Sequence, residues 1–467
     1  MTLLNSRFDP KDLWEKDRAH FLHPWTHFDS FKEHGSLVLE AGDGRHVTDA
    51  QGRRYLDGIG GMWCVNVGYG RKELADVMAE QARKLAYCNT FVDVTNAPAA
   101  LLAAKLAELA PGDLNHVFFT TSGSCANDTA IRMAHYYHGR RGEKSRRHII
   151  SRNNSYHGST FLTSSVGKRD GDFQPAFQYL TDFIHHLSAP YPYRRPKGMS
   201  VEAFTDFLVD EFRAKIAELG PQNIACFIAE PIQGSGGVVV PPPGYLKRMR
   251  ALCTENGILF IADEVVSAFG RVGHWFASEA EFGIVPDIIV CAKGITSGYF
   301  PLGVTIYSDA VHEVISAPDA EAWFTHGFTY SGHPIGCAVA LRNIEIIEED
   351  GLLAHVRKVG DRFEQRLKSL GDLPLVGEVR GRRFMMCLEY VADKATGAHL
   401  PYEVNISKRI SDKCEEKGLL VRPLGHLDIL SPPLTLTEAE ADFIVDTLGS
   451  SIRQVADQLA REGVKAA

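Results

Sequence analysis

Between about residue 70 and residue 330, helical patterns alternate with short runs rich in β-branched residues. The two clearest helical patterns lie at 72–85 and 98–109. The runs that predict strands lie at 116–121, 147–151, 224–230, 258–265 and 287–292. Strands that alternate with helices in this way indicate a mostly parallel sheet covered by helices on both faces. The fold class expected for this part of the chain is therefore α/β.

The two ends of the chain read differently from this central region. Residues 36–60 predict short strands separated by Gly-Asp-Gly and Ala-Gln-Gly turns. After Gly332 the expected elements are a long helix at 334–349, strand-like segments at 378–390 and 418–423, and a final helix at 436–461. We therefore expect a large domain at residues 68–329 and a small α+β domain built from both ends, residues 1–67 and 330–467.

Composition narrows the class of protein. The chain has 467 residues, enough for both domains and an ample core. Its net charge of −8 gives no reason to expect nucleic acid or an anionic membrane as partner. Nine cysteines are scattered singly without a CxxC pair, which is typical of reduced thiols in a cytoplasmic protein. The sequence contains no signal-peptide pattern and no apolar run long enough to cross a bilayer.

A lysine and an aspartate stand at the ends of two consecutive predicted strands. Asp263 follows Ile-Leu-Phe-Ile-Ala, and Lys293 follows Ile-Ile-Val-Cys-Ala. Burying a carboxylate costs several kcal/mol unless a cation, an arginine or a helix N-terminus pairs with it. A single lysine at a strand end is normally a solvated loop residue. Together, an amine and an acid are what pyridoxal phosphate chemistry requires, one for a Schiff base and one to keep the pyridine nitrogen protonated.

A small-residue turn follows the strand predicted at 116–121. Ser122, Gly123 and Ser124 can present backbone N–H groups and hydroxyls to a phosphate at the start of a helix, where the helix dipole adds to the attraction. Taken alone, an ordinary strand-to-helix turn with a serine cap is the commoner interpretation. The Gly-Lys-Ser/Thr ending of a Walker A loop is absent, and no G-x-G-x-x-G indicates a dinucleotide site.

Three further residues follow predicted strands. Tyr156 can stack on a cofactor ring or close the core, and His157 can act in catalysis or pack as a neutral imidazole. Glu230, before a glycine-rich loop, points toward the ligand crevice of an α/β sheet or caps its own loop. The ordered set of phosphate turn, aromatic residue, buried acid and buried lysine is the specific signal.

In this order the residues resemble the class III (subgroup II) aminotransferases of PLP fold type I, the family of the ω-transaminases. The likeness runs from Gly42 to the segment Ser431-Pro-Pro-Leu-Thr. The motifs that carry it best are Asp263-Glu-Val, Phe269-Gly-Arg-Val-Gly273, Pro286-Asp287 and Lys293-Gly294. The segments Gly60-Gly-Met-Trp-Cys64 and Phe328-Thr-Tyr-Ser-Gly-His-Pro334 look like those of amine:pyruvate and ω-amino acid:pyruvate enzymes.

The resemblance implies a role for each matching position. Lys293 binds pyridoxal 5′-phosphate covalently and shuttles the proton, while Asp263 keeps the ring nitrogen protonated. The implied cofactor-binding set is Ser122, Gly123, Ser124, Tyr156, His157, Glu230, Asp263, Val265, Lys293 and Thr329. Thr329 reaches the phosphate of the neighbouring subunit, which implies a homodimer with shared sites. Trp63, Phe91 and Tyr156 line the substrate pocket, where Arg422 pairs with a substrate carboxylate; the alternative for Arg422 is a surface salt bridge.

One position departs from the family pattern. The phosphate turn usually continues Gly-Ser-Glu-Ala, whereas this chain has Cys125 in place of the glutamate. Backbone N–H groups bind a phosphate whatever that side chain is, so phosphate binding is still expected. The loss of a negative charge near the helix N-terminus slightly favours an anion there.

The expected activity is transfer of an amino group from a primary amine or ω-amino acid to a keto acid, with pyruvate the expected acceptor. An aminomutase, a decarboxylase or a lyase on the same scaffold would share Lys293 and Asp263. A cofactor-binding regulatory module is disfavoured because no DNA-binding region is appended. Trp63 and Phe91 favour an apolar amine, while Arg422 and Glu230 leave β-alanine, taurine, diamines and 4-aminobutyrate open.

No metal site is expected. His20, His23 and His27 have suggestive spacings, but Pro24 interrupts any helix between them and no nearby carboxylate completes a ligand set.

Overall fold

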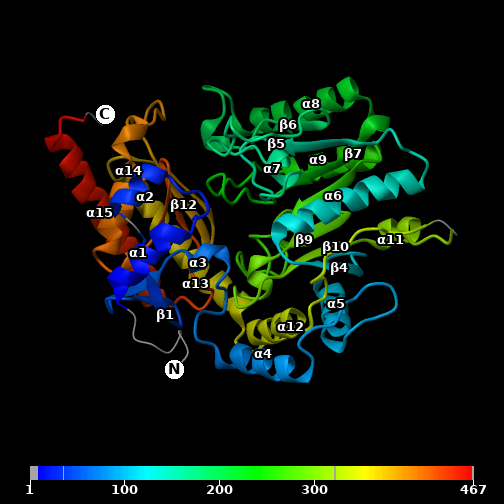
Figure 1. The fold of residues 1–467 in the computed structure, drawn as a ribbon. Helices are drawn as coiled ribbons and strands as arrows, with labels where there is room; N and C mark the ends of the chain where they lie inside the picture. The colour runs from blue at the N-terminus through cyan, green and yellow to red at the C-terminus, as the bar shows by residue number, and fades with distance from the viewer. Residues whose placement is uncertain (1–8, 35, 320–321, 465–467) are drawn as a thin grey trace.

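The main sheet of the molecule has seven strands. The structure, a computed structural model, describes residues 9–34, 36–319 and 322–464. The strands of this sheet are β4 (His116–Thr120), β5 (His148–Arg152), β6 (Ile184–Leu187), β7 (Ile224–Ala229), β8 (Leu259–Asp263), β9 (Ile288–Cys291) and β10 (Gly303–Tyr307), in the order β4-β10-β9-β8-β7-β5-β6 (Figure 1). Only β10 runs antiparallel to its neighbours, so the predicted mostly parallel sheet is confirmed.

Helices cover both faces of this sheet, as predicted. One face carries α6 (Gly123–Arg140), α7 (Thr163–Val166) and α11 (Asp309–Ile315), and the other carries α5 (Ala97–Leu109), α8 (Val201–Leu219) and α9 (Tyr245–Glu255). Successive side chains of β7 alternate between the two layers: Cys226 and Ile228 pack with α6, Phe227 and Ala229 with α8 and α9. Burial on both faces explains why these strands read as continuous apolar runs.

Two four-stranded sheets form the second part of the molecule. One has the order β1-β2-β3-β13, from β1 (Leu39–Asp43), β2 (His46–Asp49), β3 (Arg54–Asp57) and β13 (Leu419–Leu420). The other has the order β11-β12-β15-β14, from β11 (Val376–Arg382), β12 (Met385–Tyr390), β14 (Arg422–Leu424) and β15 (Leu427–Leu430). Because β3 pairs with β13, residues from both ends of the chain share a sheet.

The segment predicted at 378–390 as one strand-like stretch is a hairpin. The chain reverses at Arg383, whose φ of +49° lies in the left-handed region, and β11 then pairs antiparallel with β12. β11 carries two glycines, and Gly381 just before the turn is a local signal for the reversal that the prediction of a single stretch did not use. The short segment at 418–423 likewise divides between β13 and β14, which belong to different sheets.

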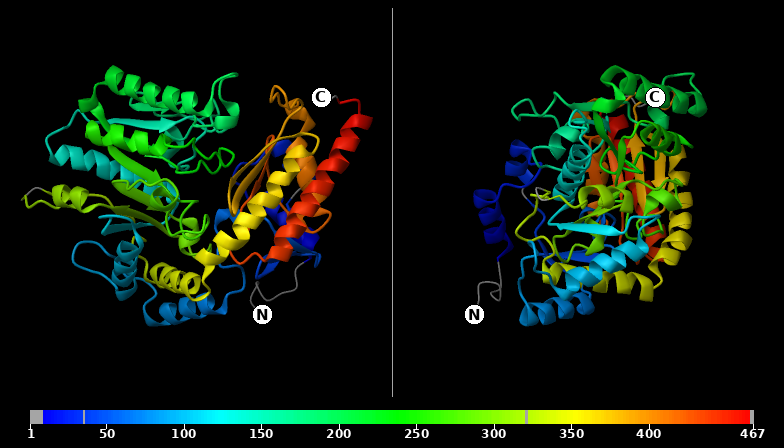
Figure 2. Two further views of the ribbon diagram at one scale, coloured as in Figure 1. Left: turned by 180° about the vertical axis from the view of Figure 1, so that it is seen from behind. Right: turned by 90° about the vertical axis from the view of Figure 1, so that its right-hand side faces the viewer.

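Further helices complete the molecule and connect its parts. They are α1 (Pro10–His20), α2 (Phe28–His34), α3 (Gly60–Trp63), α4 (Lys72–Lys84), α10 (Ala277–Ala280), α12 (Pro334–Glu349), α13 (Leu352–Lys368), α14 (Ile406–Glu415) and α15 (Glu438–Arg461). The helix α12 packs against α4 and α5, and α13 packs alongside α15 (Figure 2). None of the helices in the described ranges is long and apolar enough to cross a membrane.

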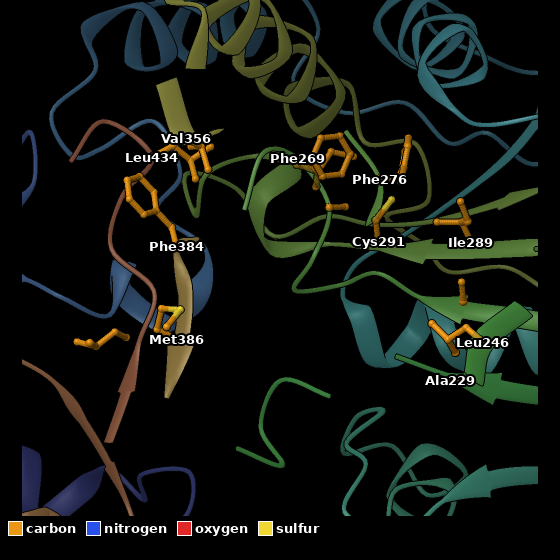
Figure 3. Packing of buried hydrophobic residues seen from close by; sticks show 14 of the residues in the cluster. Ala229, Leu246, Phe269, Phe276, Ile289, Cys291, Val356, Phe384, Met386 and Leu434 are labelled. Carbon is orange, nitrogen blue, oxygen red and sulfur yellow. The ribbon is translucent and has the colours of Figure 1, made fainter. Parts of the chain in front are cut away.

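A continuous apolar core joins the seven-stranded sheet to the sheet that contains β12. Figure 3 shows Phe269 lying between Cys291, at the end of β9, and a group that includes Phe384 and Leu434. All four side chains are buried. The ends of the parallel strands are therefore held firmly against the second part of the molecule.

The start of β10 approaches the turn after β4 very closely. A Cβ atom on Gly303 would collide with the carbonyl oxygen of Ser122, which lies between β4 and α6. Glycine is therefore the residue that lets β10 insert between β4 and β9 without displacing this turn.

We expect Gly303→Ala to destabilise the fold by about 1–3 kcal/mol, because the added methyl group forces the backbone apart. Thermal unfolding followed by circular dichroism should show a lower midpoint. The matched control is Gly139→Ala in α6, where an added Cβ meets no atom within 4 Å. That change should leave the midpoint unaltered or raise it, by up to about 1 kcal/mol of stability. Equal midpoints for the two variants would contradict the close approach.

Candidate active site

The candidate site lies at one edge of the seven-stranded sheet. The strands β4, β5, β7, β8 and β9 all run in the same direction, so their carboxyl ends meet at this edge. Asp263 is the last residue of β8 and pairs with Val290 of β9, three residues before Lys293. Ligands of open α/β sheets bind in the crevice outside such strand ends.

Asp263 is the centre of a buried hydrogen-bond network. Its side chain is 5% exposed, and its Oδ2 lies 2.7 Å from Asn127 Nδ2 and 2.8 Å from His157 Nδ1. Its Oδ1 accepts a bond of 3.1 Å from the backbone N–H of Val265. Asn127 also donates to the carbonyl of His157 at 2.8 Å. The carboxylate is thus held by an imidazole and an amide, rather than by the arginine or helix N-terminus considered from the sequence.

Lys293 supplies a free amine beside this acid. Burial lowers the pKa of Lys293, against the opposing effect of Asp263, Cys64 and Glu230, while Arg422 lowers it further. Within the described ranges no hydrogen bond or ion pair engages its Nζ, and it forms none with Asp263. A buried amine with a lowered pKa is a nucleophile toward a carbonyl group. Its φ of +47° is strained for a side chain of this kind and turns the chain sharply after β9.

The turn after β4 forms an anion site at the start of α6. Ser122 caps the helix by accepting from the N–H of Cys125 at 3.2 Å. The N–H groups of Gly123 and Ser124 donate to no atom of the described chain, as is usual for the first residues of a helix. Val265 packs on this turn, because a Cβ on Gly123 would lie 3.0 Å from its side chain. Free N–H groups at the start of an 18-residue helix fit a phosphate.

Glu230 holds its own loop and the neighbouring one together. Its Oε1 accepts from the N–H of Tyr156 at 3.1 Å, and its Oε2 from the N–H of Gly234 at 2.7 Å. Burial raises the pKa of this carboxyl group. Both oxygens are therefore engaged by backbone, which agrees with the loop-capping interpretation of this residue.

Aromatic and cationic side chains line the outer part of the site. The ring of Tyr156 lies 5.9 Å from Trp25 and 5.7 Å from the guanidinium of Arg169. Burial, and then the charge of Arg169, lower the pKa of Arg422. No acid of the described ranges forms an ion pair with Arg422, so the surface salt bridge considered from the sequence is not formed. Trp63 is buried and lies against Gly234, in the loop after Glu230.

Two residues that were predicted for the site, Thr329 and Phe91, lie apart from the residues around Asp263 and Lys293. Thr329 is exposed, and its carbonyl accepts from Tyr87 Oη at 2.9 Å. Phe91 is 50% exposed and its ring lies against Gly327. Within the described ranges no hydrogen bond, ion pair or ring contact connects either residue with Asp263 or Lys293. Their place on an exposed segment is compatible with a role toward a second subunit.

Three residues of the site, Asn127, Trp25 and Arg169, were not predicted from the sequence. Asn127 had a usable signal, because it lies four residues after Gly123 and thus on the same face of α6. Trp25 and Arg169 had no such signal in the sequence. They come from segments far apart in the chain, and their place beside Tyr156 is a result of tertiary packing.

The residues present fit pyridoxal phosphate. Asp263 is buried and Lys293 half-buried, and they form no ion pair with each other, so each is available to a different end of one ring. Two free N–H groups at the start of α6 can take the phosphate. His157 Nε2 and Asn127 Oδ1 are buried and without a hydrogen-bond partner, which marks this part of the site as polar and incompletely satisfied.

The chain is similar to proteins of a known family. The family model for aminotransferase class-III matches residues 30–452. A putrescine–pyruvate aminotransferase of Pseudomonas aeruginosa is 39% identical over 445 residues, covering 94% of this chain and 95% of that protein. An (S)-enantioselective ω-transaminase of Thermomicrobium roseum has a TM-score of 0.93 at 41% identity, covering 96% and 99% of the two chains. The ω-transaminase of Pseudomonas jessenii, solved in complex with PMP, has a TM-score of 0.93 at 36% identity, with coverage of 96% and 99%.

The lowered pKa of Lys293 makes a chemical prediction that needs no turnover. More of this amine is neutral at a given pH than of an ordinary lysine, so it should react first with an aldehyde. The protein is incubated with pyridoxal phosphate at about pH 7, a value well below an ordinary lysine pKa. It is then reduced with borohydride and digested for mass spectrometry.

The labelled peptide should contain Lys293, and Lys293→Ala should remove the label. Lys84→Ala, at the exposed end of α4, is the control and should leave the labelling unchanged. Labelling spread evenly over exposed lysines would contradict a reactive Lys293.

Proposed function

The chain belongs to the class-III aminotransferases, and from this premise we propose that it moves an amino group from an ω-amino acid or other primary amine to pyruvate. It is a pyridoxal-phosphate-dependent transaminase of PLP fold type I, as predicted from the sequence. The observation that supports its chemistry best is the unpaired, half-buried amine of Lys293, whose pKa burial lowers and whose charge the carboxylate of Asp263 influences.

Pyridoxal phosphate, when bound, supplies an aldehyde for the amino group and a protonated ring that withdraws electrons from the amine-bearing carbon. We propose that the N–H groups of Gly123 and Ser124 hold its phosphate, and that Asp263 keeps its ring nitrogen protonated. The bonds from His157 and Asn127 fix the position of the Asp263 carboxylate. Tyr156 supplies an aromatic surface at the same edge.

Lys293 carries out the proton transfer. Its Nζ removes the proton from the amine-bearing carbon of the donor and returns a proton in the second half of the reaction. Its lowered pKa means that the neutral amine needed for this step is available at a lower pH than for an exposed lysine. Lys293 follows β9, and Cys291 at the end of that strand packs in the apolar core. This packing restricts the movement of Lys293.

Arg422 supports a carboxylate-bearing acceptor. It is half-buried and has no acidic partner within the ranges described, so its guanidinium group is free to bind the carboxylate of a keto acid. The relative from Pseudomonas aeruginosa is named for pyruvate as acceptor. Trp63 and Phe91 are proposed to shape the space around the donor. No observation favours an aminomutase, decarboxylase or lyase.

The reaction is tested by supplying pyruvate and a panel of donors. We expect alanine to form in a pyruvate-dependent manner, and Lys293→Ala to lower turnover by several orders of magnitude, since no other side chain replaces its amine. Chromatography of the products gives the measurement. Lys84→Ala is again the control. Alanine formation by Lys293→Ala at the wild-type rate would rule out this mechanism, and turnover with 2-oxoglutarate but not pyruvate would rule out the acceptor.

We also propose that the protein works as a homodimer with sites at the interface. Several large apolar side chains are exposed on the two segments that carry Thr329 and Phe91, and exposed apolar patches mark interaction surfaces. They are Tyr87, Val92, Val94, Trp323 and Tyr330. Covering them with a second copy would place Thr329 of one subunit next to the phosphate turn of the other. The division into domains at 68–329 and the two chain ends, and a cytoplasmic location, stay predictions.

A shared site predicts complementation between two inactive variants. Lys293→Ala lacks the amine, and Thr329→Asp places a negative charge where the neighbouring phosphate is expected. Refolding the two together should restore about a quarter of wild-type activity, because half of the dimers are mixed and each has one intact site. Each variant refolded alone is the control. A mixture no more active than its components would contradict a shared site.

A further inference from the structure

Arg169, in the loop between α7 and β6, is a nearly buried cation with unused hydrogen-bond donors. Its side chain is 8% exposed and lines a cavity of about 700 Å³. It forms an ion pair with Asp172 through Nη2. Its Nε is buried without an acceptor, and no bond from its Nη1 is found within the described ranges. A buried guanidinium group with free donors is costly unless a ligand uses them.

Arg169 lies between this cavity and the outer part of the candidate site; Tyr156, Arg422 and Lys293 are not among the residues that line the cavity itself. Its guanidinium carbon lies 5.7 Å from the ring centre of Tyr156 and 5.8 Å from that of Trp25. Leu424 lines the same cavity and lies on the same face of β14 as Arg422, two residues earlier. Arg169 is also the charged group that acts most strongly on the pKa of Arg422.

Of these two cations, only Arg422 keeps a positive charge that no acid of the described ranges pairs with. Asp172 neutralises Arg169, and no described acid neutralises Arg422. Glu389, also in the cavity wall, is bound by Arg380, Arg194 and His399. The remaining carboxylate of the wall, Asp170, is exposed at the rim, where water and salt screen its charge. A substrate therefore meets free guanidinium donors on this side of the site.

We propose that Arg169 is a second carboxylate-binding residue of the substrate pocket and that, with Arg422, it selects ω-amino acids over diamines. This inference rests on the proposed function and specifies its donor. The anionic end of an ω-amino acid can accept from the unused donors of Arg169, whereas the ammonium end of a diamine finds no acceptor on Arg169 and is repelled by the unpaired guanidinium group of Arg422.

The rival interpretation is structural. Arg169 holds Asp172, which in turn accepts from Trp25 Nε1 at 3.3 Å, so the arginine stabilises the N-terminal segment near Tyr156. A residue with only this role would affect all donors alike. A direct role must instead change the ratio between donors that differ only at the end remote from the reacting amine.

Three donors of equal chain length make the comparison: 4-aminobutyrate, butylamine and putrescine, which end in a carboxylate, a methyl group and an ammonium group. The holoenzyme and its variants are compared by kcat/KM for each donor with pyruvate. Arg169→Met keeps the apolar part of the side chain and removes its N–H donors. Arg169→Lys keeps the positive charge but removes the planar guanidinium group that can donate two parallel hydrogen bonds. Arg213→Met, in the exposed i,i+3 pair with Asp210 on α8, is the matched control.

For Arg169→Met we expect the 4-aminobutyrate to butylamine ratio of kcat/KM to fall by about tenfold, the size of one lost charge-assisted hydrogen bond. The putrescine to butylamine ratio should stay level or rise. Arg169→Lys should lie between Arg169→Met and the wild type. Asp172→Asn removes the carboxylate that pairs with Arg169 and leaves more of its N–H donors free. This change should raise the 4-aminobutyrate to butylamine ratio of kcat/KM.

A binding measurement tests the role of Arg169 independently of whether the protein catalyses transamination. Isothermal titration of the holoenzyme with butanoate, which carries the carboxylate but no amine, should show about tenfold weaker binding to Arg169→Met and unchanged binding to Arg213→Met. Equal losses for all three donors, or butanoate binding that Arg169→Met leaves unchanged, would overturn the proposal. Absence of turnover with every donor would overturn the proposed function, while the butanoate titration would still decide on Arg169.

Discussion

The bonding of the Asp263 carboxylate holds the site together. A carboxylate at the end of a fully buried strand costs several kcal/mol unless hydrogen bonds replace its water. Asn127 from α6 and His157 from the loop after β5 provide these bonds at 2.7 and 2.8 Å. The same asparagine binds the carbonyl of His157, so one helix, one loop and one strand end are fixed relative to each other. The turn at Ser122–Ser124 begins that same helix, so these bonds fix the position of the turn as well.

The apolar core supports this arrangement from behind. Strands buried on both faces have little freedom to shift, because a slip of one residue would move every side chain into the wrong layer. The core continues through Phe269 to Phe384, so the strand ends also pack against the sheet that carries Arg422. This rigid support explains how Lys293 can keep a strained, left-handed conformation at the end of β9.

The inner and outer parts of the site differ in how well their charges are balanced. In the inner part, Asp263 and Glu230 have their oxygens engaged by protein groups. In the outer part, Arg422 lacks an acid and Arg169 has donors to spare. Chemistry that is common to a whole family depends on the first set, which needs a fixed geometry. We propose that substrate choice depends on the second set, where unsatisfied groups can meet the variable end of the substrate.

The sequence by itself determined the features that depend on neighbours along the chain. Apolar runs and helical periodicity were enough for the parallel sheet, the strand ends at Asp263 and Lys293, and the turn at Ser122–Ser124. They were not enough for β6, whose two histidines break the apolar pattern, or for β10, which forms by pairing between β4 and β9. Only the tertiary structure decided that Asn127 and His157 hold Asp263 and that Arg169 lies beside Tyr156. Those contacts join residues from distant segments, and no local pattern records which distant side chain will satisfy a buried charge.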